Sequence, residues 1–166
     1  MLAPDAVRAA LGRHACRTID PGILRPAAVL LAFYRKQGSD TVLFTRRTEH
    51  LPDHAGEISF PGGRWQEGDR DLATTALREA EEEMGIDPRD VTLLGRLDDC
   101  VSVYGYHVTP LVGSLPADYC FVPDRREIAE VLEVPLATLC DQDIFHMENW
   151  LHKGRLHPVG FFSIGH

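Results

Sequence analysis

The sequence lacks the apolar runs and cysteine pairs that would assign it to a membrane or an oxidising compartment. No apolar run approaches the length of a membrane span. Asp5 and Arg8 interrupt the amino-terminal stretch, where an export signal needs unbroken apolar residues. No two cysteines stand at the spacing of a zinc knuckle or redox pair, so neither zinc nor a thiol couple is suggested. We therefore expect a cytoplasmic protein with no membrane partner and four reduced cysteines: Cys16, Cys100, Cys120 and Cys140.

Positive charge is also scarce. The chain has 17 lysines and arginines against 25 acidic residues, which gives a formal net charge of −8. A phosphate-rich ligand would meet a repulsive field unless a basic patch or bound cations intervened, so we expect no nucleic-acid partner. At 166 residues with 44% hydrophobic side chains, the chain is long enough to bury a core, and we expect a single domain over residues 1–166.

The spacing of apolar residues predicts a mixture of strands and helices, as in an α/β or α+β sandwich. The most strongly patterned helix spans 69–84, with Asp69 as its cap and Gly85 at its end. In chain order, we expect an amphipathic helix and linker over 1–25, a central hairpin over 27–46, a short strand at 57–60, the helix at 69–84, strands at 91–97, 101–115 and near 121–123, a helix at 127–134, and a hairpin over 144–162.

The helix at 69–84 carries three glutamates on one side. Glu79, Glu82 and Glu83 stand at i, i+3 and i+4, whereas Glu81 points elsewhere. Like charges this close repel one another, and their position near the helix carboxyl end adds an unfavourable dipole interaction. Hard cations such as Mg²⁺ prefer carboxylate oxygens, so the cluster suits a catalytic metal site. On its own, a solvated acidic helix face explains the same residues.

The context of these glutamates resembles the Nudix box, G-x(5)-E-x(7)-R-E-U-x-E-E-x-G-U, in which U is a bulky apolar residue. The second half matches at Arg78, Glu79, Glu82, Glu83, Gly85 and Ile86. In the first half, Arg64 and Arg70 fall where the box has Gly and Glu. One extra residue would put Gly63 and Asp69 in those roles.

The segment before the box resembles the coenzyme A pyrophosphatase branch of that family, with its pattern L-L-T-x-R-[SA]-x(3)-R-x(3)-G-x(3)-F-P-G-G. Thr48 replaces the small residue, and Pro52 stands where a second arginine is expected. Losing that arginine removes a possible bidentate phosphate contact. The matching residues are Leu43, Thr45, Arg47, Gly56, Phe60, Pro61, Gly62 and Gly63.

The resemblance implies a Nudix-type α/β/α sandwich with a mixed sheet, and a site that holds Mg²⁺ or Mn²⁺. Glu79 and Glu83 would be the main metal ligands, with Glu82 and the Gly63 carbonyl in support, and Arg78 would orient the carboxylates. Arg46, Arg47, Gly62 and Gly63 are expected to contact a small-molecule diphosphate substrate, and the glycines allow close approach of the backbone. Further candidates for substrate contact are Arg125, Arg126, His50, His54, Tyr104 and Tyr106.

The general base is left open between Glu127 and Glu130, which follow the basic turn at 124–126. The tail FFSIGH resembles the lead-in to a final strand and helix of this branch, so we expect a truncated chain. Apolar surface near Phe161 and Phe162 would then be exposed or covered in a homodimer.

Three functions remain open on the sequence. The first is hydrolysis of coenzyme A or acyl-CoA to 3′,5′-ADP and 4′-phosphopantetheine or its acylated form, as the branch resemblance implies. The second is hydrolysis of another nucleoside diphosphate derivative, such as ADP-ribose, NADH or a damaged nucleotide, which Pro52 favours. The third is a non-catalytic binding protein of the same fold, which the imperfect first half of the box favours. Identifying products across a panel of diphosphates separates the three.

Overall fold

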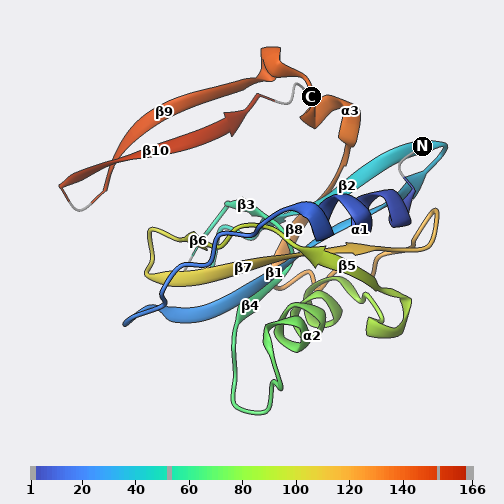
Figure 1. Ribbon diagram of the computed structural model, residues 1–166, viewed down its shortest axis with the longest axis horizontal. Coiled ribbons are helices and arrows are strands. Elements are labelled where there is room, and N and C mark those ends of the chain that lie inside the picture. Colours follow the sequence, from blue (N-terminus) through green and yellow to red (C-terminus); the bar gives the residue numbers. More distant parts are fainter. Residues whose placement is uncertain (1–2, 52–53, 153, 164–166) are drawn as a thin grey trace.

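The computed structural model describes residues 3–51, 54–152 and 154–163, and Figure 1 shows its elements. They are, in order, α1 Pro4–Arg13, β1 Arg25–Lys36, β2 Ser39–Arg47, β3 Ile58–Ser59, β4 Gly62–Arg64, α2 Leu72–Met84, the 3₁₀ turn η1 Pro88–Asp90, β5 Thr92–Arg96, β6 Cys100–Val101, β7 Tyr106–Ser114, β8 Ile128–Pro135, α3 Leu136–Leu139, the 3₁₀ turn η2 Gln142–Ile144, β9 Phe145–His152 and β10 Arg155–Phe162.

Among the described residues, eight strands form one mixed sheet centred on β1. One edge of β1 runs parallel to β7 from Arg25 to Phe33. Its other edge is shared, because β4 pairs antiparallel with residues 27–29 and β2 with residues 33–36. β2 pairs with β1 only over residues 39–42 and then diverges from it, with β8 and β3 as its other partners. The glycines of β4 therefore lie inside the sheet, where β1 and β2 separate.

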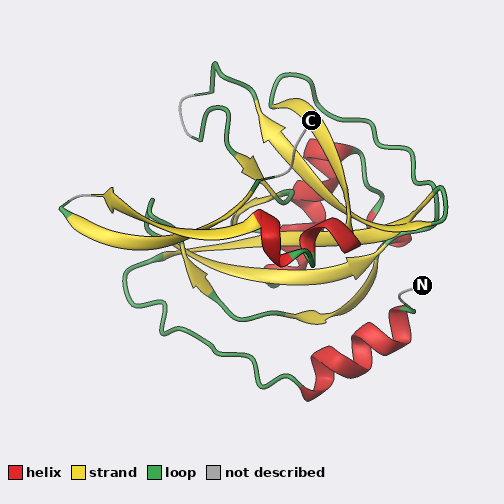
Figure 2. Ribbon diagram, turned by 90° about the horizontal axis from the view of Figure 1, so that it is seen from above, coloured by secondary structure: helices red, strands yellow, loops and turns green. Residues whose placement is uncertain are grey.

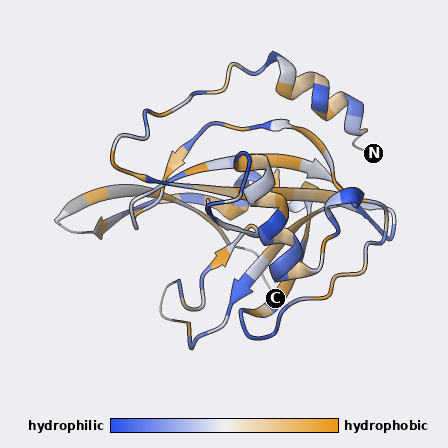
Figure 3. Cartoon of the chain, turned by 90° about the horizontal axis from the view of Figure 1, so that it is seen from below, coloured by the Kyte–Doolittle hydropathy of each residue, from blue (hydrophilic) through white to orange (hydrophobic). Residues whose placement is uncertain are grey.

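Helices cover both faces of this sheet, which confirms the expected sandwich with a mixed sheet (Figures 1 and 2). On one face, Ala76, Ala80 and Met84 of α2 pack against Leu30 and Leu43. On the other face, α1 packs beside a smaller cluster that includes Phe33, Val42 and Leu94. Figure 3 shows hydrophilic and hydrophobic residues along both helices, and the hydrophobic ones that contact the sheet recur at helical spacing, as in amphipathic helices. The expected helix within residues 1–25 and the hairpin over 27–46 are also present.

α2 begins later than expected. Asp71, rather than Asp69, is the cap, and its side chain accepts hydrogen bonds from the backbone N–H and the hydroxyl of Thr74. The helix ends as expected at Gly85, whose φ of 66° lies in the left-handed region that favours glycine. Asp69, which precedes the helix, has a different role, because it forms an ion pair with Arg78 of α2.

Three other expectations are wrong. The helix expected over 127–134 is instead strand β8, Ile128–Pro135, because pairing with β2 over seven residue pairs outweighs the helical spacing of the apolar side chains. Residues 121–123 form no strand, although Phe121 packs edge-on against Tyr34. The single strand expected over 101–115 is instead two strands, β6 and β7, separated by a turn at 102–105.

The tail forms the expected hairpin, with β9 and β10 paired from Phe145 to Phe162 in a sheet of their own. The hairpin stands apart from the main sheet in Figure 1. Its exposed apolar side chains are Phe145, Met147, Trp150, Leu151, Leu156 and Phe162. A homodimer formed through this surface stays a prediction. Within the described ranges, no helix is long and apolar enough to cross a membrane.

Candidate active site

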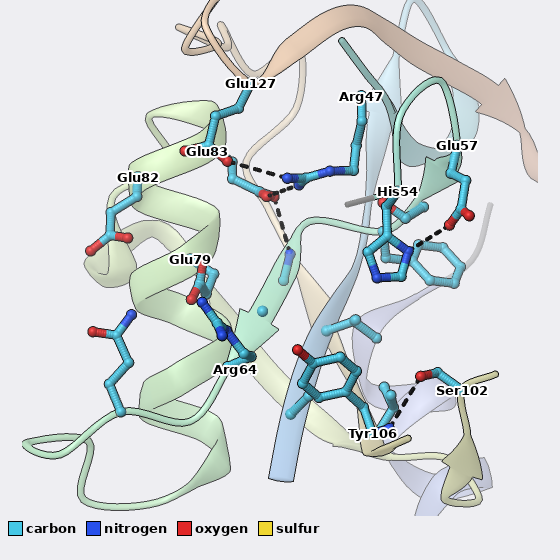
Figure 4. A pocket seen from close by; sticks show the side chains of 18 residues that line it. Arg47, His54, Glu57, Arg64, Glu79, Glu82, Glu83, Ser102, Tyr106 and Glu127 are labelled. Carbon is cyan, nitrogen blue, oxygen red and sulfur yellow. Dashed lines mark hydrogen bonds and ion pairs between the residues drawn. The ribbon is translucent and has the colours of Figure 1, made fainter. Parts of the chain in front are cut away.

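A cleft of about 400 Å³ opens where β1 and β2 separate (Figure 4). Glu79, Glu82 and Glu83 of α2 line one side, and Gly62 and Gly63 of β4 form its floor. The opposite wall consists of the segment 54–60 and the turn before β7. The structure thus brings the glutamate helix and the FPGG segment into one cavity.

Glu83 is the most buried carboxylate of the cleft, at 5% exposure. One of its oxygens accepts a hydrogen bond of 3.1 Å from the backbone N–H of Gly62, and the other accepts one of 3.1 Å from the guanidinium of Arg47. Burial nevertheless raises its pKa to about 7, and the nearby carboxylates of Glu79 and Glu127 act in the same direction. A buried carboxylate with such a pKa has less positive charge around it than its ionised form needs.

Arg78 links the carboxylates along α2. Its guanidinium lies 3.0 Å from Asp69, 2.9 Å from Glu79 and 3.1 Å from Glu82, and it also donates to the backbone carbonyl of Arg64. The hydrogen bonds from Arg78, helped by those from the Gln66 backbone N–H and the Thr75 hydroxyl, lower the pKa of Asp69 to about 2. Asp69 and Arg78 therefore form a fixed ion pair that positions Glu79, while Glu82 remains largely exposed.

Gly63 leaves room for Glu79. A Cβ atom at position 63 would lie 2.5 Å from the Glu79 carboxylate, which is closer than any real contact. At Gly62 a Cβ would lie 2.4 Å from the backbone carbonyl oxygen of Ala28 on β1. Gly62 is therefore needed so that β4 can lie close to the backbone of β1, whereas Gly63 is needed to leave space for the Glu79 side chain.

The site suits a hard divalent cation. Its donors are carboxylate oxygens, which Mg²⁺ and Mn²⁺ prefer. The Glu79 carboxylate occupies the space over Gly63. Burial also raises the pKa of the partly buried Glu79, although Arg78 opposes the effect, so the arginines only partly offset the cost of burying Glu79 and Glu83. The glutamates do not converge on one point, because Arg78 holds Glu79 and Glu82 while Arg47 holds Glu83. A cation would have to compete with these arginines.

The wall opposite α2 contains a hydrogen-bonded group that the sequence did not predict. Glu57 accepts hydrogen bonds from the Tyr104 hydroxyl and, at 2.7 Å, pairs with His54 Nδ1. The rings of His54 and Tyr104 lie 4.0 Å apart. Burial would raise the pKa of Glu57, but the bonds from Tyr104 and His54 outweigh it and lower the pKa. His54 thus presents its ring to the cleft (Figure 4).

Tyr106, one of the predicted substrate contacts, also lines the cleft, and the Arg25 guanidinium lies 4.2 Å from its ring centroid. Arg64, which the box pattern had marked only as a mismatch, lines the cleft beside Glu79. Its place directly after the glycines of β4 was the signal available in the sequence.

Several predicted residues lie elsewhere. Arg46 does not line the cleft, because alternation along β2 turns it away from Arg47 and toward Glu130 at 2.9 Å. The cleft lining therefore gives no support to substrate contact by Arg46, which stays a prediction. Arg125, Arg126 and His50 are exposed and also lie outside the cleft lining. Glu127 does line it, 3.5 Å from Arg47.

The glutamates of α2 thus lie directly beside the glycines of β4, within one cleft of this sandwich. The NUDIX domain family model matches residues 24–153. Over 135 residues the chain is 42% identical to the "Uncharacterized Nudix hydrolase NudL" of Yersinia pestis (strain Pestoides F), covering 81% of this chain and 67% of that protein. The chain belongs to the Nudix hydrolase family and is a pyrophosphohydrolase.

Solved structures agree with the fold. The chain is similar to the Nudix hydrolase RenU of M. smegmatis, with a TM-score of 0.59 and 21% identity, over 70% of this chain and 73% of that one. It is also similar to the NUDIX domain of Shewanella oneidensis NrtR in complex with ADP ribose, with a TM-score of 0.54 and 20% identity, over 74% and 81% of the two chains. Nudix enzymes generally need divalent metal ions.

Proposed function

We propose that the chain hydrolyses the diphosphate linkage of coenzyme A or acyl-CoA to 3′,5′-ADP and 4′-phosphopantetheine or its acylated form. The observation that carries this proposal is the in-register match from Leu43 to Gly63 to the coenzyme A pyrophosphatase pattern. This segment supplies Arg47, His54 and both cleft glycines. Four residues that match the branch pattern thus line the same cleft as the glutamates of the general Nudix box: Arg47, Phe60, Gly62 and Gly63.

Glu79 and Glu83 would be the principal ligands of Mg²⁺ or Mn²⁺, with Glu82 and the Gly63 carbonyl in support. When bound, such a cation neutralises phosphate charge and lowers the pKa of a coordinated water. Arg78 would act as a positioning residue, because its pair with Asp69 fixes the guanidinium that holds Glu79. Arg47, at one end of the cleft, would bind a substrate phosphate when a cation takes its place beside Glu83.

Glu127 is the proposed general base. It lines the cleft near Arg47, whereas Glu130 is paired with Arg46 outside it. A water oxygen attacks phosphorus, its proton passes to the Glu127 carboxylate, and the bond from that phosphorus to the bridging oxygen breaks. The bridging oxygen leaves with the other phosphate group.

Glu127→Gln should therefore lower kcat by about 10²-fold, the smaller end of a general-base contribution. Glu130→Gln is the matched control, since it removes the neighbouring glutamate of the same strand region outside the cleft. Steady-state rates across pH check the assignment, and the acidic limb of the wild-type profile should be lost in Glu127→Gln. Equal rates and equal pH profiles for the two variants would reject Glu127 as the base.

A second candidate function is hydrolysis of another nucleoside diphosphate derivative such as ADP-ribose. Pro52 favours it, because an arginine that could hold a phosphate is missing at that position. Pro52 lies outside the described residues. The similar NrtR domain was solved with ADP ribose, which makes this compound the appropriate competitor in a test.

The two candidates differ in relative kcat/KM. We expect coenzyme A to be cleaved with the higher value, and Pro52→Arg to increase its advantage over ADP-ribose. One charged hydrogen bond contributes about 1.5–3 kcal/mol, or roughly tenfold to a hundredfold. Parallel assays of both substrates, with products identified by mass, measure this ratio. A wild-type preference for ADP-ribose, or a ratio unmoved by Pro52→Arg, would replace the coenzyme A assignment with the second candidate.

A further inference from the structure

A histidine, a cysteine and an aspartate meet outside the cleft. His14 and Cys16 follow α1, and Asp98 follows β5, more than eighty residues further along the chain. One ligand atom from each lies within 4.8 Å of the other two, and no other group of three or more such residues does so in the described part of the chain. His14 Nε2 lies 2.7 Å from Asp98 Oδ1.

We propose that His14, Cys16 and Asp98 bind one Zn²⁺ ion, or a similar borderline-soft divalent cation, with a fourth position open to water. A thiolate, an imidazole and a carboxylate are the ligand types that Zn²⁺ accepts in tetrahedral sites. This donor set differs from the all-oxygen cleft, which suits harder cations. The spacing of the cysteines gave no sign of it, because two ligands come from one short segment and the third is distant in sequence.

The local backbone supports the arrangement. His14 leaves α1 with extended φ and ψ of −78° and 116°, and side chains two residues apart on an extended chain point to the same side. His14 and Cys16 can therefore both face Asp98. The Cys16 thiol is half-buried and donates to the carbonyl of Arg96 at 3.2 Å. Binding of the cation would release the thiol proton to solvent.

Arg17 is the competing cation. Its Nε lies 2.9 Å from Asp98 Oδ2, and its backbone N–H donates to Oδ1 at 3.0 Å. The Arg17 side chain is 86% exposed, so moving it into water costs little. Asp98 can keep Arg17 on Oδ2 while Oδ1, which already faces His14, turns to the cation.

The site would fasten the amino-terminal helix to the sheet. α1 buries none of its residues fully, and its packing rests mainly on Val7 and Leu11 beside the smaller cluster. Binding to three side chains that join residues 14–16 to residue 98 would stabilise this attachment, since a ligand of the folded state shifts the folding equilibrium.

Cobalt(II) titration of the reduced full-length chain tests the proposal, because a sulfur-to-cobalt charge-transfer band reports a thiolate ligand. The cleft lining contains no sulfur, so cobalt bound there gives no such band. We expect one equivalent of cobalt to produce the band and Zn²⁺ to abolish it. Cys16→Ser should remove the band, and His14→Gln should weaken cobalt binding at least tenfold. Cys120→Ser, which changes an exposed cysteine elsewhere, is the matched control.

Circular dichroism of each variant establishes that it is folded before titration. A wild-type chain without the sulfur band, or a band that survives Cys16→Ser, overturns the proposal. Zn²⁺ should also raise the Tm of wild type but not of Cys16→Ser. An equal rise in the Tm of both proteins would mean that Zn²⁺ stabilises them by binding in the cleft, and it would also overturn the proposed site.

Discussion

Glu83→Gln is expected to lower kcat by about 10³-fold or more while leaving the fold intact. A cation that stabilises developing phosphate charge contributes several kcal/mol, and about 4 kcal/mol corresponds to about 10³-fold in rate. Glutamine has nearly the same shape as glutamate but carries no charge for the cation. It can still accept a hydrogen bond from Gly62 or Arg47, so α2 keeps its place. Steady-state kinetics with Mg²⁺ and Mn²⁺ measure the loss.

Glu81→Gln is the matched control, because it removes a neighbouring glutamate that does not line the cleft. Its kcat should stay close to the wild-type value. A Glu83→Gln protein with nearly normal activity would remove Glu83 from the site, whatever the control does.

Glu83→Gln should also change how the free energy of unfolding depends on pH. The pKa of Glu83 is about 7 in the folded protein because of burial, against 4.5 for a free side chain. The folded state therefore binds this proton more tightly, and its stabilising effect, complete below pH 4.5, is lost as the pH rises through 7. From pH 5 to 8, this group alone should remove about 2–3 kcal/mol from the free energy of unfolding of the metal-free protein.

Glu83→Gln should lose this contribution, so its stability should fall less steeply over the same range. Urea unfolding with a chelator present, at pH 5 and pH 8, measures the difference between the two proteins. Parallel pH dependence in wild type and variant would mean that the carboxylate of Glu83 is ionised at ordinary pH without a cation.

Gly63→Ala is expected to lower activity by about 10²-fold, because displacing a catalytic group by about 1 Å has that order of effect. The new methyl group would meet the Glu79 carboxylate at 2.5 Å. A side chain can move, so the fold should survive. Gly62→Ala should instead destabilise the protein by about 3 kcal/mol, the upper part of the usual range for overpacking, because its methyl group meets the backbone of β1.

Activity and urea unfolding of both variants separate the two effects. If Gly63→Ala were as active as wild type, Glu79 would not need its present position over β4. If Gly62→Ala were as stable as wild type, the close pairing of β4 with β1 would be wrong.

The features of the site that follow from local sequence were predicted well. The helical spacing of Ala76, Ala80 and Met84 placed the glutamates on one helix, and Gly85 marked its end. The cap was misplaced by two residues because Asp69 and Asp71 both precede the helix. Only the fold shows that Asp69 binds Arg78.

The features that depend on distant pairing were missed. The apolar spacing of residues 127–134 suits a helix, but residues 128–135 form a strand because they make backbone hydrogen bonds with the edge of β2. The contact of Glu57 with Tyr104 joins residues 47 positions apart, and that of Arg47 with Glu83 joins residues 36 apart. No local pattern encodes such pairs, so one wall of the cleft could not be assembled from the sequence.

The central claim is that this cleft performs cation-dependent hydrolysis of a diphosphate linkage. The most direct measurement incubates wild type and Glu83→Gln with a panel of diphosphates, including coenzyme A and ADP-ribose, and identifies the products by mass. We predict that wild type splits at least one of them between its two phosphorus atoms, only when Mg²⁺ or Mn²⁺ is present, and that Glu83→Gln does not. Cleavage that persists in a chelator, or equal cleavage by both proteins, would contradict the account.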